Sequence, residues 1–278
     1  MSLSFASLNS GSNGNCYYIG NSEEAIFVDA GLSCRETDLR MKRLGLDIKR
    51  VKAIFVSHEH SDHIQGVHQL VTKYQIPVYV TQSTLKEAGF WKIRKHVIHF
   101  TENEPVTIGN LRVVSFVKKH DACDPHSFVV SQGNTNIGVF TDIGEPCDQL
   151  IHYFRQCHAA FLESNYDEDM LENGRYPVYL KKRIRGGSGH LSNRQALELF
   201  MKYRPSFMSH LLLSHLSKEN NKPELVKSLF TSITGSTQVI IASRYQESAL
   251  YHIPLQENPL RLHQVRKTNP VKQQLTLF

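Results

Sequence analysis

The chain alternates short apolar runs, rich in β-branched and aromatic residues, with segments in which apolar residues recur every three to four positions. The runs predict strands at 3–8, 16–19, 25–29, 53–56, 78–81, 111–116, 127–131, 137–141, 159–162, 208–214 and 237–241. The other segments predict helices at 36–44, 64–74, 83–90, 146–157, 192–203 and 223–232. Strands follow one another directly within 3–29 and within 106–141, which excludes a purely alternating parallel sheet. We therefore expect a mixed α/β fold in which two mixed sheets pack face to face with helices outside.

The composition fits one large folded unit. With 278 residues and 40% hydrophobic content, the chain can bury a sizeable core. No apolar run approaches the roughly 20 residues of a membrane helix, and the first residues do not resemble a signal peptide, so we expect no membrane association. The five cysteines show no paired spacing, which predicts reduced thiols and a cytoplasmic protein.

The densest group of chemically active side chains follows the apolar run 53–56 and reads Ser57-His58-Glu59-His60-Ser61-Asp62-His63. A loop after a buried strand is where α/β proteins place functional groups. His58 and His60 are two residues apart, so in extended backbone they point the same way and can bind one ion. Asp62 and His63 follow where a helix would begin and point elsewhere, which suits a second ion. A solvated histidine cluster is the alternative, but four ligand-type residues at this spacing favour a metal site.

This pattern, His-x-His-x-Asp-His after an apolar strand, resembles the signature of the metallo-β-lactamase superfamily. Further motifs of that family follow in order along nearly the whole chain. Asp29 in IFVDAG resembles the strand ending in Asp-x-Gly that precedes the metal loop, and His120, Asp142 and His215 match the later metal-ligand positions. The resemblance implies the αββα sandwich of this superfamily, two mixed sheets flanked by helices.

The resemblance also implies a site for two divalent ions. One ion would be held by His58, His60 and His120, the other by Asp62, His63 and His215, with Asp142 between them. Two such ions activate water and clamp the attacking and leaving oxygens of a displacement, which makes Asp62 and Asp142 catalytic candidates as well. Imidazole suits zinc and carboxylates widen the choice towards manganese, so either metal is expected. Cys123, near His120, is a bystander or a further ligand.

Five strings narrow the resemblance within the superfamily: SGSNGNC, HDACDP, TDIGEP, GHLSN and SHLSKENN. Together they resemble the YycJ/WalJ-like branch, which is associated with 5′-to-3′ DNA exonuclease activity. The resemblance implies a metal-dependent phosphodiesterase that acts on DNA in repair or replication. Nothing between residues 140 and 210 is large enough for the inserted second domain of RNA-degrading β-CASP relatives.

Two residues outside the metal set are candidates for the phosphate chemistry. In related tRNA 3′-processing nucleases a histidine placed like His190 acts near the scissile phosphate, so we expect His190 to protonate the leaving oxygen or to stabilise phosphate charge. A histidine in a capping loop is the alternative. Glu163 ends a predicted strand and is expected to orient His190 or a metal-binding histidine. The turn at 10–15 is either a plain hairpin loop or part of the rim of the metal pocket.

The net charge of +6 includes a basic cluster just before His190, composed of Lys181, Lys182, Arg183 and Arg185. Basic surfaces attract polyphosphates without reading sequence, so we expect this cluster to guide nucleic acid, although a solvated face is the alternative.

The last residues form a second candidate interaction site. Residues 1–262 are expected to form the hydrolase domain, and 263–278 a flexible basic tail. The tail ends in QLTLF, which resembles the bacterial sliding-clamp-binding pentapeptide. A clamp contact is therefore expected through Gln274, Leu275, Leu277 and Phe278. Packing of these residues on their own domain is the alternative.

Three rival functions stay open. An RNA-processing nuclease of the same fold would suit His190 equally well. A thioester or lactone hydrolase would not need the basic cluster, and a clamp- or DNA-binding adaptor would not need a full ligand set. Cleavage by an Asp62→Ala variant and clamp binding after deletion of 274–278 would distinguish them.

Overall fold

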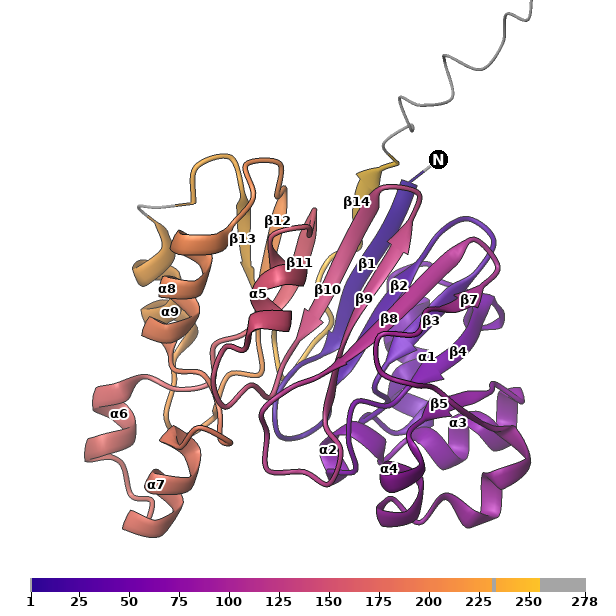
Figure 1. The fold of residues 1–278 in the computed structure, drawn as a ribbon, viewed down its shortest axis with the longest axis horizontal. Helices are drawn as coiled ribbons and strands as arrows, with labels where there is room; N and C mark the ends of the chain where they lie inside the picture. The colour runs from indigo at the N-terminus through magenta and orange to yellow at the C-terminus, as the bar shows by residue number, and fades with distance from the viewer. Residues whose placement is uncertain (1, 232–233, 256–278) are drawn as a thin grey trace, which may run out of the picture.

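The computed structural model describes residues 2–231 and 234–255, which form two mixed sheets packed face to face (Figure 1). The first sheet has the order β14-β1-β2-β3-β4-β5-β6. Its strands are β1 (Ser2–Asn9), β2 (Cys16–Gly20), β3 (Ala25–Val28), β4 (Val51–Phe55), β5 (Val78–Val80), β6 (Val97–His99) and β14 (Tyr251–Pro254). Neighbours from β14 to β3 are antiparallel, and those from β3 to β6 are parallel.

The second sheet repeats this division, with the order β13-β12-β11-β10-β9-β8-β7. Its strands are β7 (Val106–Ile108), β8 (Leu111–Val117), β9 (His126–Gln132), β10 (Thr135–Phe140), β11 (Ala159–Glu163), β12 (His210–Ser214) and β13 (Gln238–Ile241). Pairs from β7 to β10 are antiparallel, and those from β10 to β13 are parallel. The loops after β10, β11 and β12 therefore leave the sheet at the same edge.

Helices cover the outer face of each sheet. The first sheet is covered by α1 (Cys34–Arg43), α3 (Val67–Tyr74), α4 (Gln82–Glu87) and the 3-10 helix η2 (Phe90–His96), and the second by α5 (Asp148–Phe154), α8 (Asn193–Tyr203) and α9 (Pro223–Thr231). Two more helices, α6 (Glu168–Asn173) and α7 (Val178–Arg185), extend beyond the second sheet at the end of the molecule where α2 (Ser61–Ile64) lies (Figure 1).

Alternation along the strands divides the core into layers. In β3, Ala25 and Phe27 pack outward against the helices, while Ile26 and Val28 pack into the layer between the sheets. Phe55, Phe128 and Phe161 belong to the same inner layer and join the two sheets. The predicted αββα architecture is confirmed.

Four helical segments were not predicted, namely α6, α7, η2 and the 3-10 helix η1 (Ile48–Arg50), and neither were the three short strands β6, β7 and β14. No residue of α7 is buried, and although Leu180 and Ile184 are spaced as on one face of a helix, four basic residues among only eight leave a weak helical pattern. The predicted helix 64–74 overlaps α2 only at Ile64 and otherwise corresponds to α3, which begins after Gly66. A Cβ on Gly66 would lie 1.8 Å from the carbonyl oxygen of Leu32, because the chain packs directly on the β3–α1 connection there.

Two further expectations concern membrane helices and the end of the chain. None of the described helices is long and apolar enough to cross a membrane. The predicted boundary between 1–262 and 263–278, and the QLTLF segment with it, lie outside the described residues, so the structure does not test them.

Candidate metal centre

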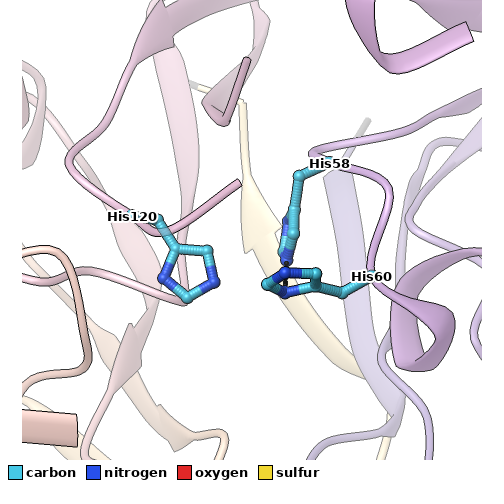
Figure 2. A group of neighbouring side chains, drawn as sticks. All are labelled: His58, His60 and His120. Atoms are coloured by element: carbon cyan, nitrogen blue, oxygen red, sulfur yellow. Dashed lines mark hydrogen bonds between the residues drawn. The ribbon is translucent and has the colours of Figure 1, made fainter. Parts of the chain in front are cut away.

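The metal loop follows β4 and leads into α2. His58 is fully buried, and its Nε2 lies 3.1 Å from Nδ1 of His60 (Figure 2). Two nitrogens bound to one tetrahedral zinc at 2.0–2.1 Å are about 3.3–3.4 Å apart, so this separation is close to that of a shared ion. Gly31 allows the metal loop to pack directly against the segment after β3, because a Cβ at Gly31 would lie 1.7 Å from the carbonyl oxygen of Asp62.

His120 reaches the same point from the other sheet. It follows β8, and its ring centre lies 4.9 Å from that of His58 and 5.2 Å from that of His60. Figure 2 shows His58 and His60 on one side and His120 facing them from the other. Ligand atoms of the three histidines lie within 4.8 Å of one another. The structure thus brings together the three residues predicted for the first ion.

The second predicted set, Asp62, His63 and His215, also has its ligand atoms within 4.8 Å of one another. Asp142 lies between the two sets. Its carboxylate oxygens are 3.3 Å from His63 Nε2, 3.3 Å from His215 Nδ1 and 3.9 Å from His120 Nε2. The position of Asp142 is that expected of a carboxylate shared by two ions.

Hydrogen bonds at the Nδ1 atoms prepare four of the histidines to bind a metal through Nε2. His58 Nδ1 lies 2.8 Å from Ser57 Oγ, His63 Nδ1 2.7 Å from Asp29, His120 Nδ1 3.0 Å from the Gly189 carbonyl and His215 Nδ1 3.0 Å from Glu163. Protonation of Nδ1 leaves the lone pair of each ring on Nε2.

The buried atoms left without partners fit a bound cation. Nε2 of His120, Nε2 of His215 and Oδ2 of Asp142 are buried and make no hydrogen bond to any of the described residues. Native structures seldom leave such atoms unsatisfied. These residues therefore fit divalent metal ions, because lone-pair atoms from both sheets converge at one point where a cation could bind.

Charge at the site supports the same conclusion. Burial alone would raise the pKa of the Asp142 carboxyl, but His215 and His63 hold that pKa well below its usual value. Burial would lower the pKa of His215, but Asp142, Asp62 and Glu163 raise it to about 10. In the metal-free protein, protonated histidines therefore balance the negative charge of the carboxylates. A bound divalent ion would take over this role and displace the protons.

Two residues outside the predicted site orient the metal loop. Asp29 is fully buried and accepts hydrogen bonds from the amide and hydroxyl of Ser57 and from His63. Asn15 donates to Asp62 Oδ2 at 3.0 Å and lies 3.1 Å from His63 Nε2. The Asp-x-Gly motif signalled Asp29, whereas no local pattern in the turn at 10–15 singled out Asn15.

Backbone strain is concentrated at this site. Five non-glycine residues of the described chain have positive φ angles, and three of them are Asp29 (60°), Asp142 (55°) and His215 (57°). Each follows the end of a strand, where the left-handed conformation turns the chain sharply. Such conformations destabilise a non-glycine residue by about 1–3 kcal/mol and cluster at functional sites.

Glu163, the last residue of β11, connects the metal set to His190. It is fully buried, and its Oε1 accepts from His190 Nδ1 at 2.8 Å and from His215 Nδ1 at 3.0 Å. Burial alone would raise its pKa, but His190 and His215 lower the pKa to about 2. Glu163 is therefore a carboxylate that contacts both histidines it was expected to orient. Nε2 of His190 makes no hydrogen bond within the described part of the chain, and His190 lines the cavity over the metal set.

The predicted basic cluster lies on α7 and its members have different surroundings. Arg183 lines the metal cavity and pairs with Asp121, the residue after His120. Lys181 and Arg185 instead bind Glu172, and Lys182 is exposed. Only Arg183 of the four lies directly at the cavity.

Cys123 is not part of any candidate ligand group among the described residues. Its thiol donates to Glu59 Oε2 at 3.0 Å, and partial burial together with Glu59 raises the pKa of the thiol to about 11. Of the two interpretations, the structure supports the bystander.

Two mixed sheets with a His/Asp site at their shared edge are typical of metallo-β-lactamase-fold hydrolases. Comparison with known proteins leads to the same class. Residues 10–209 match the model of the metallo-β-lactamase superfamily, to which the chain belongs. It is therefore a metal-dependent hydrolase. The solved structure of the metallo-β-lactamase fold protein YhfI from Bacillus subtilis superimposes with a TM-score of 0.70 over 91% of this chain and 100% of that one, at 16% identity, a likeness of fold alone.

Within the superfamily the chain falls in the YycJ/WalJ branch. It is 36% identical to exodeoxyribonuclease YycJ of Bacillus anthracis over 236 residues, which cover 82% of this chain and 87% of that protein. It is 32% identical to exodeoxyribonuclease WalJ of Streptococcus pneumoniae over 228 residues, or 80% of this chain and 84% of that protein.

Proposed function

We propose that this protein is a metal-dependent exonuclease that degrades DNA from the 5′ end. The observation that carries the proposal is the convergence of all seven predicted metal-binding side chains beneath one open cavity. Relatives named exodeoxyribonucleases, similar over most of their length, support DNA as the substrate. Zinc or manganese, two ions in number, is the cofactor that the His/Asp set favours.

When bound, the ions would supply a nucleophilic water and stabilise charge on the phosphate. His58, His60 and His120 would hold one ion, Asp62, His63 and His215 the other, and Asp142 would contact both. The remaining chemistry belongs to His190. Glu163 accepts a hydrogen bond from Nδ1–H of His190, which orients Nε2 towards the cavity so that it can give a proton to the leaving oxygen. Arg183 at the cavity rim would attract the phosphate backbone.

The proposed setting is DNA repair or replication in the cytoplasm. Five free cysteines, none paired in a disulfide, agree with a reducing compartment. Contact with a sliding clamp through QLTLF is proposed from the sequence alone. Replacing Leu277 and Phe278 by alanine should abolish binding to a purified clamp; unchanged binding would remove the clamp from the proposal.

End-labelled DNA and matched RNA, incubated with the full chain in Mn²⁺ or Zn²⁺, test the activity. Stepwise loss of DNA from the 5′ end is expected with the wild-type chain and not with Asp62→Ala. Loss from the 3′ end would correct the polarity, and cleavage of RNA alone would make the protein an RNA-processing nuclease. If neither polymer is cleaved in either metal, thioesters and lactones become the substrates to test, and DNA binding without cleavage would indicate an adaptor.

A further inference from the structure

A second cavity lies beside the metal site and plays no part in the mechanism above. A small intermediate cavity connects the two. It shares Ser12, Asp121, Arg183 and His190 with the metal cavity, and Ser217 with the second cavity. The three hollows therefore adjoin one another, and a strand whose scissile phosphate lies at the metals has the second cavity within its path.

The second cavity carries two cations and no carboxylate. It has a volume of about 260 Å³, and its lining includes Lys218, Arg244, Ser243 and Asn221. Neither cation forms an ion pair with a described residue, whereas Arg43 nearby in the fold pairs with Glu247 at 3.1 Å. A hollow with uncompensated positive charge and hydroxyl groups is suited to an anion.

One donor of Arg244, a residue that lines the second cavity, lacks a polar partner. Its Nη1 atom is buried yet makes no hydrogen bond to any residue in the described ranges. Leaving a buried charged donor unsatisfied is unfavourable by more than the 1–3 kcal/mol typical of neutral groups. A phosphate oxygen is the acceptor that matches a guanidinium best, through charge and paired N–H donors.

The neighbouring Tyr245 adds an aromatic surface to this charge. Its side chain is 69% exposed, and the Arg244 guanidinium lies 6.0 Å from its ring centre. An exposed ring beside a phosphate-binding group is how many proteins bind single strands, because every base can stack on it.

The turn at 10–15 fixes this segment relative to the metals. Asn13 donates to the carbonyl of Arg244 at 2.8 Å, and the Ser10 amide donates to the carbonyl of Ser243 at 3.1 Å. On its other side, the Ser10 hydroxyl accepts from the amide of His215 at 2.7 Å. The same turn thus contacts a metal-binding histidine and the cationic cavity, which favours the rim interpretation over a plain hairpin loop.

We propose that this cavity is a nucleotide subsite for the substrate strand, in which Arg244 and Lys218 bind a phosphate next to the scissile one and Tyr245 stacks on its base. The subsite rests on the proposed nuclease function and adds to it a requirement for single-stranded substrate longer than one phosphodiester.

The test compares Arg244→Gln, Arg244→Lys and Tyr245→Ala with wild type in the full chain, on a short single-stranded DNA and on bis(p-nitrophenyl) phosphate, which has only the phosphate that is cleaved. Arg112→Gln on the exposed side of β8 is the matched control. For Arg244→Gln we expect KM for DNA to rise about tenfold to a hundredfold, and a far smaller change with the diester. The slope of log affinity against log salt should fall by about 0.7. Arg244→Lys should retain part of the affinity, and Tyr245→Ala should raise KM without changing the slope.

Equal KM values and salt slopes for wild type and Arg244→Gln would overturn the subsite while leaving the nuclease intact. If wild type cleaves no DNA, the nuclease proposal fails on its own, and fluorescence anisotropy of the labelled strand on Asp62→Ala decides the subsite. There, an Arg244→Gln substitution should weaken binding, and unchanged binding would overturn the inference. A deoxynucleoside monophosphate could also compete with DNA in wild type but not in Arg244→Gln. If KM for DNA is unchanged in that variant, the cavity binds free nucleotides instead, and the subsite proposal is overturned.

Discussion

Replacing Glu163 by glutamine is the sharpest test of how the metal centre is organised. The substitution keeps size and shape at a fully buried position. All four partners of the carboxylate are donors. Oε1 accepts from His190 and His215, and Oε2 accepts from the backbone amides of Ile143 at 2.6 Å and Leu191 at 3.1 Å. Glutamine offers one oxygen and one NH₂ group, so it cannot satisfy this arrangement.

The size of the effect follows from the protonation of His215. If the amide oxygen stays with the two backbone donors, the NH₂ group faces two Nδ1–H groups. The conflict is relieved when His215 moves its proton to Nε2, the atom 3.5 Å from Asp62 that would bind the metal. Loss of this kind of orienting contact lowers metal affinity about tenfold to a hundredfold. That range corresponds to about 1.4–2.7 kcal/mol of binding free energy.

Metal affinity is measured by competition with a chelating dye, using the full chain with Zn²⁺ and separately with Mn²⁺. Glu23→Gln, an exposed position between β2 and β3, is the matched control and should bind as wild type does. Circular dichroism of the metal-free variant establishes that it is folded. A folded Glu163→Gln protein with wild-type affinity for both metals would refute the argument, because the orientation of His215 would then not depend on this carboxylate.

Three further predictions concern the loop, a thiol and the metal. Gly31→Ala should lower the free energy of unfolding of the metal-free chain in urea by about 3 kcal/mol, because its Cβ would overlap the backbone of Asp62. Gly45→Ala, with φ +69° but open space, should lose only about 1–2 kcal/mol, and equal losses would contradict the packing argument. Because the pKa of Cys123 is raised to about 11 from 9.0, its alkylation at pH 8 should be about a hundredfold slower than that of an ordinary thiol and should rise with pH towards 11; Glu59→Gln should accelerate it, and mass spectrometry that finds no acceleration would contradict this cause. Chelation should lower the thermal midpoint of wild type, since free metal at a hundred times Kd stabilises by about 2.7 kcal/mol; Asp142→Asn should show a smaller shift, and an equal one would argue against a shared carboxylate.

The sequence predicted those parts of the site whose signal is local. The metal loop could be recognised because four ligand-type residues lie within six positions after a buried strand, and His120, Asp142 and His215 because their motifs resemble those of the metallo-β-lactamase superfamily. The order of strands and helices excluded a purely alternating sheet, and the resemblance implied the two packed sheets. Each of these signals lies within a dozen or so residues, so no knowledge of tertiary packing was required.

The rest depends on contacts between distant segments. Asn15 donates a hydrogen bond to Asp62, 47 positions further along the chain. Nothing in the sequence around Asn15 indicates which of several polar turn residues will do so. Arg244 lies beside the metal site only because its segment packs against the turn at 10–15, more than two hundred positions earlier in the chain. Helix α7 is short and buries no residue, so its basic side chains were noticed but not their division between the cavity rim and Glu172.

The placement of ligands on both sheets has a thermodynamic consequence. His58 and His63 extend from the first sheet, whereas His120, Asp142 and His215 extend from the second. The ligand atoms meet only when the sheets pack through the inner core layer, so a bound ion stabilises that packing as well as the loops. Without metal, the same point holds buried carboxylates balanced only by protonated histidines, beside three strained residues, and protonated histidines cannot bind the ion. Metal binding and the association of the two halves are therefore one linked equilibrium, in which the ion supplies the charge that the packed sheets require.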